Sequence, residues 1–128
     1  MNKDSPTIGP HEGIELKLML EGKKNLALFY SDYEIPEEFH KRIEQKALFL
    51  NTVKIKTRLN GAFIDFFIIS KARNDENVLK LASLIRKSLS EIEFNPEVER
   101  GIGRLLGYRE LDIEYFIKRK IERREDKK

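Results

Sequence analysis

Hydrophobic and polar residues alternate through residues 53–70 in two runs on either side of Asn60 and Gly61. An Asn-Gly pair between two such runs is a strong signal for a β-hairpin, because a type I′ turn needs positive φ at both central positions. A two-residue turn also fixes the register of the two strands. The predicted cross-strand pairs include Val53 with Ile68, Ile55 with Phe66 and Lys56 with Asp65.

The predicted hairpin has one apolar face and one mixed face. Basic groups attract phosphates and exposed rings stack on bases, so a mixed face of this kind suits single-stranded nucleic acid. In the alternative that we favour, the charges pair across the strands, and a helix or a second subunit covers the aromatic residues. The candidate binding or interface residues on this face are Lys54, Arg58, Phe63, Phe67 and Ile69.

Other segments show helical or strand periodicity. Residues 26–30 are short and apolar and predict a strand, whereas residues 14–20 fit a strand or a helix equally well. Helices are predicted for residues 36–50, 75–89, 96–106 and 110–126, the last with Ile113, Phe116, Ile117 and Ile121 facing inward. The fold class is therefore α+β: a small antiparallel or mixed sheet containing the hairpin, helices on one face of it, and a C-terminal run of three helices.

Residues 101–107 carry three glycines and Arg104. A helix-hairpin-helix motif uses Gly-Ile-Gly as a tight turn that offers backbone N–H groups to a DNA phosphate, and Arg104 would assist there. Glycines inside a helix also allow another helix to pack closely, which offsets their cost of about 1 kcal/mol each. We favour the packing interpretation, because motif matches of this length carry many false positives.

The length of 128 residues indicates one domain. We expect a flexible arm at residues 1–13, which includes His11, a folded domain at 14–117 and a basic helical tail at 118–128. The polar N-terminus and the absence of a long apolar run predict a cytoplasmic protein without a membrane segment. A charged fraction of 37% and the absence of cysteine are typical of thermophile proteins, although seven asparagines argue against such a source.

Basic charge is concentrated at the C-terminal end. The last 11 residues hold seven basic and three acidic residues, so this segment is +4 and the rest of the chain is −1. Nucleic-acid affinity, where it exists, is then expected to be electrostatic, non-specific and housed in the tail. The tail residues proposed for this contact are Lys118, Arg119, Arg123 and Arg124.

No catalytic, cofactor-binding or metal-binding constellation is apparent. The chain has two histidines, of which His40 lies at helical spacing from Glu37 and Glu44, an arrangement more typical of a solvated pair than of a metal site. Without cysteine, a serine nucleophile would need a histidine base, and no serine lies in a nucleophile-elbow context.

Residues 102–116, which read I-G-R-L-L-G-Y-R-E-L-D-I-E-Y-F, resemble an uncharacterised archaeal domain family. Members of that family carry a Leu-Leu-Gly-Tyr-Pro segment followed by two cysteines and an aromatic pair. This chain has Arg109 in place of the proline, and Leu111 and Asp112 in place of the cysteines. The resemblance implies an archaeal source and a helical segment over residues 108–116, and a thiol or metal role could not carry over.

Three hypotheses of function follow. The first is a non-enzymatic interaction module that forms a homodimer through the outer face of the hairpin or through the C-terminal helices. The second is an RNA- or DNA-binding protein that uses the basic tail, assisted by the hairpin face or by residues 101–107. The third, which the sequence favours least, is an enzyme that uses Asp32, Glu34 or His40.

Overall fold

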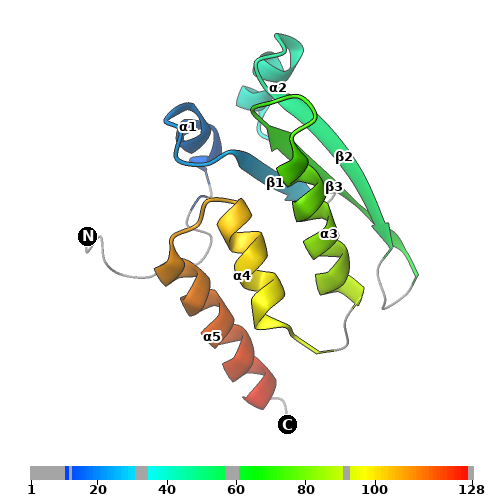
Figure 1. Cartoon of the computed structure of the whole chain (residues 1–128), viewed down its shortest axis with the longest axis vertical. Coiled ribbons are helices and arrows are strands. Elements are labelled where there is room, and N and C mark those ends of the chain that lie inside the picture. The colour runs from blue at the N-terminus through cyan, green and yellow to red at the C-terminus, as the bar shows by residue number, and fades with distance from the viewer. Residues whose placement is uncertain (1–10, 12, 31–34, 57–60, 91–92, 127–128) are drawn as a thin grey trace.

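A computed structural model of the chain describes residues 11, 13–30, 35–56, 61–90 and 93–126. These residues form one three-stranded antiparallel sheet with helices packed around it (Figure 1). The α+β class and the C-terminal run of helices are therefore confirmed. The elements in chain order are α1 (Glu15–Leu20), β1 (Leu26–Tyr30), α2 (Glu37–Glu44), β2 (Phe49–Lys56), β3 (Phe63–Ser70), α3 (Glu76–Ser90), α4 (Pro96–Leu105) and α5 (Glu110–Asp126).

The strand order is β1-β3-β2, and β3 runs antiparallel to both neighbours. Strands β1 and β2 are therefore parallel to each other, and the chain reaches β2 from β1 through α2. Strand β3 then inserts between them, which makes a split β-α-β arrangement. The last strand of the sequence is thus the central strand of the sheet.

The predicted faces of the hairpin are confirmed, but the predicted cross-strand pairs are wrong by two residues. Lys56 pairs with Phe63 and Ile55 pairs with Ile64, so residues 57–62 connect the strands. Residues 57–60, which include Asn60 of the predicted Asn-Gly turn, lie outside the described part of the chain, and Gly61 beside them has φ of 70°. A shift of two residues leaves every side chain on its predicted face, because successive side chains of a strand point to opposite faces.

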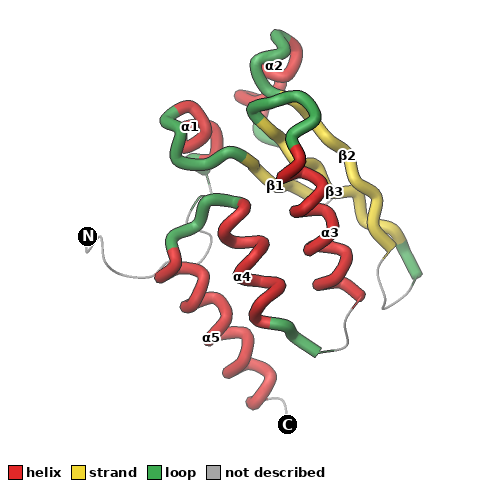
Figure 2. Tube along the Cα trace, in the orientation of Figure 1, coloured by secondary structure: helices red, strands yellow, loops and turns green. Residues whose placement is uncertain are grey.

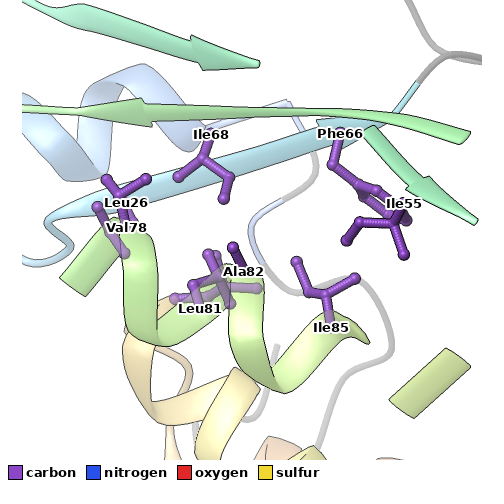
Figure 3. Packing of buried hydrophobic residues seen from close by; sticks show 9 residues of the cluster. Leu26, Ile55, Phe66, Ile68, Val78, Leu81, Ala82 and Ile85 are labelled. Atoms are coloured by element: carbon purple, nitrogen blue, oxygen red, sulfur yellow. The ribbon is translucent and has the colours of Figure 1, made fainter. Parts of the chain in front are cut away.

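One face of the sheet forms a core with α3. Strand residues Ile55, Phe66 and Ile68 are buried against α3, and the side chains of Ala82 and Ile85 point toward them from the helix (Figure 3). The apolar positions of α3 recur every three or four residues, and this spacing places them along one side of the helix. Leu106, at the end of α4, joins the same cluster.

The opposite face of the sheet forms a second core with α1 and α2. Phe39 of α2 and Ile69 of β3 are fully buried in it, and Ala27 of β1 lies beside them. Helices thus cover both faces of the sheet, which corrects the prediction of helices on one face only. Ile69 is also corrected: it belongs to the core and not to an exposed apolar surface.

Residues 14–20, which fitted a strand or a helix, contain the short helix α1. Helix α2 ends earlier than its periodicity predicts. Lys46 has φ of 62°, and the Ala47 N–H donates to the carbonyl of Arg42 at 2.9 Å, a hydrogen bond that closes a helix C-terminus. A lysine in this conformation gives no sequence signal, unlike the glycine that usually ends a helix. Residues 49 and 50 therefore belong to β2.

Helices α3, α4 and α5 lie side by side, with α4 in the middle (Figure 2). Asn95 accepts hydrogen bonds from the N–H groups of Glu97 and Val98 and caps α4, as its sequence predicts. Gly101 and Gly103 lie inside α4. A Cβ atom on Gly101 would lie 2.8 Å from Cδ1 of Leu84 in α3, and one on Gly103 would lie 2.7 Å from Cγ1 of Ile113 in α5. The packing interpretation of residues 101–107 is therefore confirmed, and the helix-hairpin-helix interpretation is wrong.

Helix α5 matches its predicted bounds and continues through the basic segment as far as Asp126. Ile113 and Ile117 face inward as predicted. Phe116 and Ile121, which were also expected inside, keep 37% and 40% of their surface exposed.

Candidate functional site

The most unusual feature of the interior is a cluster of polar side chains around Lys24. Lys24 lies in the turn before β1 and is only 2% exposed, although lysine is almost never fully buried unless it is paired. The chain packs tightly here, because a Cβ atom on Gly107 would lie 2.8 Å from Cβ of Lys24 and 3.1 Å from the Lys23 carbonyl oxygen. Gly107 has φ of 79° and ends α4, so this glycine both stops the helix and lets the turn before β1 come close.

Lys24 binds two side chains from the N-terminal part of the chain. Its ammonium donates a short charge-assisted hydrogen bond to Glu15 of α1, and Nζ lies 3.0 Å from Nδ1 of His11. Burial lowers the pKa of Lys24 and raises the pKa of Glu15, and the bond between the two groups opposes both shifts. The pair therefore compensates two charges that are costly to remove from water.

His11 and Tyr108 complete the cluster. The two rings contact edge to face with centroids 4.5 Å apart, and Nζ of Lys24 lies 5.5 Å from the centre of the Tyr108 ring. Burial raises the pKa of Tyr108 to about 12 and lowers the pKa of His11 to about 4. His11 was expected in a flexible arm, but its side chain is 8% exposed.

Asp112 and Arg109 border the cluster on the side of α5. Asp112 is 3% exposed, and the Arg109 guanidinium donates to both of its carboxylate oxygens at 2.8 and 3.0 Å. This bidentate geometry compensates the buried carboxylate. The carboxylate raises the pKa of His11, but by less than burial and Lys24 lower it.

Lys24 and the five residues around it come from three separate parts of the chain: residues 11–15, residue 24 and residues 108–112. No local pattern signals their meeting, because a lysine in a turn and a histidine near the N-terminus are ordinarily solvated. Tyr108 contacts His11 and Lys24 from far along the chain, beyond the reach of helical or strand periodicity, and only the packing of the α4–α5 turn on the turn before β1 brings these residues together.

The predicted surface sites are placed differently by the structure. On the hairpin, Lys54 is exposed, Phe63 is 61% exposed, Phe67 is half-buried and Ile69 is buried, while Arg58 lies outside the described residues. The apolar patch expected on this face is therefore smaller than the sequence suggests. Phe63 is the apolar candidate that remains well exposed among the described residues of this face.

Arg104 is engaged by its own chain. Its guanidinium donates to Glu110 at 2.8 and 3.1 Å, which links the end of α4 to the start of α5. Arg100 binds Glu114 in the same bidentate way at 2.8 and 2.9 Å. Both arginines have pKa values raised by these hydrogen bonds. Their role in the structure is to hold α4 and α5 together.

The basic tail keeps several exposed cations. Lys118, Lys120 and Arg123 are exposed on α5, whereas Arg119 is half-buried with its guanidinium 5.8 Å from the Tyr115 ring centre. The side chain of Arg124 lies outside the described part of the structure. The described cations of the tail thus include three that face solvent.

An apolar groove lies between α3 and α4. Its volume is about 590 Å³. Leu79 of α3 borders it and is 74% exposed, more than any other large hydrophobic side chain in the described residues. Gly101 has no side chain, so Leu84 of α3 packs directly against α4 at this position. The lining residues are Leu79, Lys80, Ser83, Leu84, Gly101 and Leu105.

Within the described residues, no group of three or more histidine and carboxylate side chains is arranged to hold a metal ion. None of the described helices is long and apolar enough to cross a bilayer. No protein-family model, curated protein or solved structure matches this chain. The resemblance of residues 102–116 to an archaeal family therefore stays a prediction.

Proposed function

We propose that this domain is a non-enzymatic interaction module that self-associates through the groove between α3 and α4. The observation that supports this most is Leu79, which presents a large apolar side chain to solvent at the edge of an apolar groove. Exposed apolar side chains next to an apolar depression are characteristic of interaction surfaces.

A second copy of the chain is the occupant that fits this surface. A two-fold interface uses the same patch on both subunits, so the patch must be complementary to itself. This patch has the exposed Leu79 at the edge of the apolar groove between α3 and α4, and a two-fold arrangement can place Leu79 of each copy in the groove of the other.

The charges along α3 support the same pairing. Glu76 and Lys87 are exposed near opposite ends of the helix. The residues of α3 that line the groove lie between these two positions along the chain. Antiparallel pairing of two α3 helices brings Glu76 of one copy near Lys87 of the other, whereas parallel pairing brings like charges together. Electrostatic complementarity of this kind fixes the orientation of an interface.

Sedimentation or light scattering across a concentration series tests the proposal. Leu79→Glu removes two apolar contacts from each dimer, which at about 1.5 kcal/mol per leucine raises the dimer Kd at least about 100-fold. The matched control is Leu111→Glu, which changes a leucine that is 44% exposed on α5, away from the groove. A wild-type protein that stays monomeric at high micromolar concentration would contradict the proposal.

A third variant separates the two surfaces named for self-association. Phe63→Glu disrupts a dimer formed by the outer face of the hairpin and leaves a dimer formed by α3 and α4 intact. Loss of the dimer in Phe63→Glu but not in Leu79→Glu would move the interface to the hairpin.

A second candidate function is non-specific binding of RNA or DNA by the tail. It is favoured by the exposure of Lys118, Lys120 and Arg123, while Arg100 and Arg104 are engaged by carboxylates. Cations that neutralise phosphates release counterions, so this binding should weaken steeply between about 50 and 200 mM salt.

Fluorescence anisotropy with a labelled single strand and a labelled duplex tests this candidate. The tail variant changes four basic residues to glutamine and preserves the length of α5: Lys118, Arg119, Arg123 and Arg124. Its control makes the same change of net charge at four exposed lysines elsewhere: Lys17, Lys23, Lys41 and Lys71. Equal loss of binding in both variants would show that affinity depends on net charge and not on the tail.

A further inference from the structure

The direction of the hydrogen bond between Lys24 and His11 defines the charge state of the histidine. An ammonium group only donates hydrogen bonds, so Nδ1 of His11, 3.0 Å from Nζ of Lys24, must be the acceptor. A nitrogen that accepts carries no proton, and the ring is then neutral with its proton on Nε2. The hydrogen bond to Glu15 favours the charged form of Lys24 and opposes the burial that lowers its pKa.

Among the described residues, the charged groups near His11 are engaged in two ion pairs. Lys24 and Glu15 form one ion pair, and Asp112 and Arg109 form another. Tyr108 contributes only the edge-to-face contact of its ring. A proton on His11 therefore adds a positive charge while the Asp112 carboxylate, which favours that charge, is already bound by Arg109. It also places an N–H group opposite an ammonium at hydrogen-bond distance.

We propose that His11 is a pH-operated latch, whose protonation ejects its side chain from between Lys24 and Tyr108 and opens these two residues to solvent. Neutral His11 closes the cluster and satisfies one proton of the Lys24 ammonium. The released histidine is solvated and takes up its proton at the ordinary pKa of about 6.5, whereas the docked histidine resists protonation down to about pH 4.

The direction of the effect follows from proton linkage. Between about pH 6.5 and pH 4 the open state binds one more proton than the closed state, so the opening equilibrium increases about tenfold for each unit that the pH falls. Above pH 6.5 both states are unprotonated at His11, and opening is independent of this group. The latch is thus closed at neutral pH and loosens in acid.

Amide hydrogen exchange measures this opening directly. The Ile14 N–H donates to the His11 carbonyl at 3.0 Å, so the protection of this amide reports on the backbone at the latch. We expect Ile14 protection to fall about tenfold per pH unit below pH 6.5. It should also remain well below the protection of Ile68 in the central strand, since the opening is local. Ile14 protection that is constant with pH, or equal to that of Ile68, would overturn the proposal.

His11→Asn provides the variant that cannot titrate. The Asn oxygen can accept from Lys24 in place of Nδ1 and does not gain a proton in this pH range. We expect the acid-dependent loss of Ile14 protection to disappear in this variant. If the loss persists, another group drives the opening and the proposal fails.

Two lysine variants test the charge that opposes protonation. In a His40→Gln background, NMR follows the one remaining imidazole. Lys24→Met should make His11 titrate at a higher pH than in the parent protein, and Lys23→Met should leave the titration unchanged, because Lys23 is paired with Glu21 at the surface. Equal titration in both variants would contradict the role given to Lys24. The measurement on the parent protein stands if a variant fails to fold.

Discussion

Lys23 and Lys24 are neighbours in the sequence and have opposite environments in the structure. The Lys23 side chain is 67% exposed and pairs with Glu21 at 3.0 Å, whereas the Lys24 side chain is 1% exposed and pairs with Glu15. A surface pair gains little because water screens it, while a buried pair compensates charges that have lost their hydration. Two residues of the same type therefore differ in their contribution to stability because of their surroundings alone.

We expect Lys24→Met to destabilise the domain by about 3 kcal/mol, because it leaves the Glu15 carboxylate without its buried partner. Lys23→Met should change the free energy of unfolding by less than about 0.5 kcal/mol. Urea denaturation at neutral pH measures both. Similar values for the two variants would show that the ion pair of Lys24 contributes no more than a surface pair.

At the scale of elements, the alternation of residues in the hairpin predicted the face on which each side chain lies, but not the residues that pair across the two strands. Alternation of apolar and polar residues determines which side chains face α3, and this holds for any register that differs by an even number of residues. The pairs depend on where the chain turns, and in the observed register Lys56 lies opposite Phe63.

Cysteine pairs distinguish the observed register from the register of a two-residue turn. The chain contains no cysteine, so an introduced pair has no competitor. Lys54→Cys with Asp65→Cys should form a disulfide on mild oxidation, because these residues face each other across β2 and β3. Lys56→Cys with Asp65→Cys, the pair expected from a two-residue turn, should form it poorly, since diagonal positions exceed the reach of a disulfide. Mass spectrometry reads the yield, and the reverse ranking would restore the two-residue turn.

At the scale of the whole molecule, the sheet is a middle layer with a core on each face. Helix α3 covers one face, and the short helices α1 and α2 cover the other (Figure 1). The second core explains why the mixed face of the hairpin carries Ile69, which is buried under these helices. Phe63 lies on the same face but is exposed and does not belong to this core.

Replacing one buried and one exposed phenylalanine with alanine tests whether the second core contributes to stability. Phe39→Ala removes a ring that is fully buried in the second core and should destabilise the domain by about 3–5 kcal/mol. Phe63→Ala, at a position that is 61% exposed, should cost less than about 0.5 kcal/mol. Thermal or urea unfolding measures both. A neutral Phe39→Ala would mean that α2 does not form part of the core.

Local features of the sequence predicted much of the fold. The Asn95 cap, Pro96 and the glycine stop at Gly107 marked the ends of α4, and the apolar periodicity of α3 and α5 located these helices within a residue. These signals are reliable because capping, backbone conformation and periodicity involve residues within one or two turns. The bounds of α2 were missed because Lys46 takes a conformation that lysine seldom adopts.

The candidate site was decided by tertiary structure alone. Lys24, His11 and Tyr108 are ordinary residues in their local sequence, and their burial, charge state and contacts arise only when the turn after α4 packs against the turn before β1. The same holds for the groove, in which Leu79 and Gly101 meet across two helices. Short-range patterns specify elements, but the free energy of burying a charge or exposing a leucine depends on neighbours that are distant along the chain.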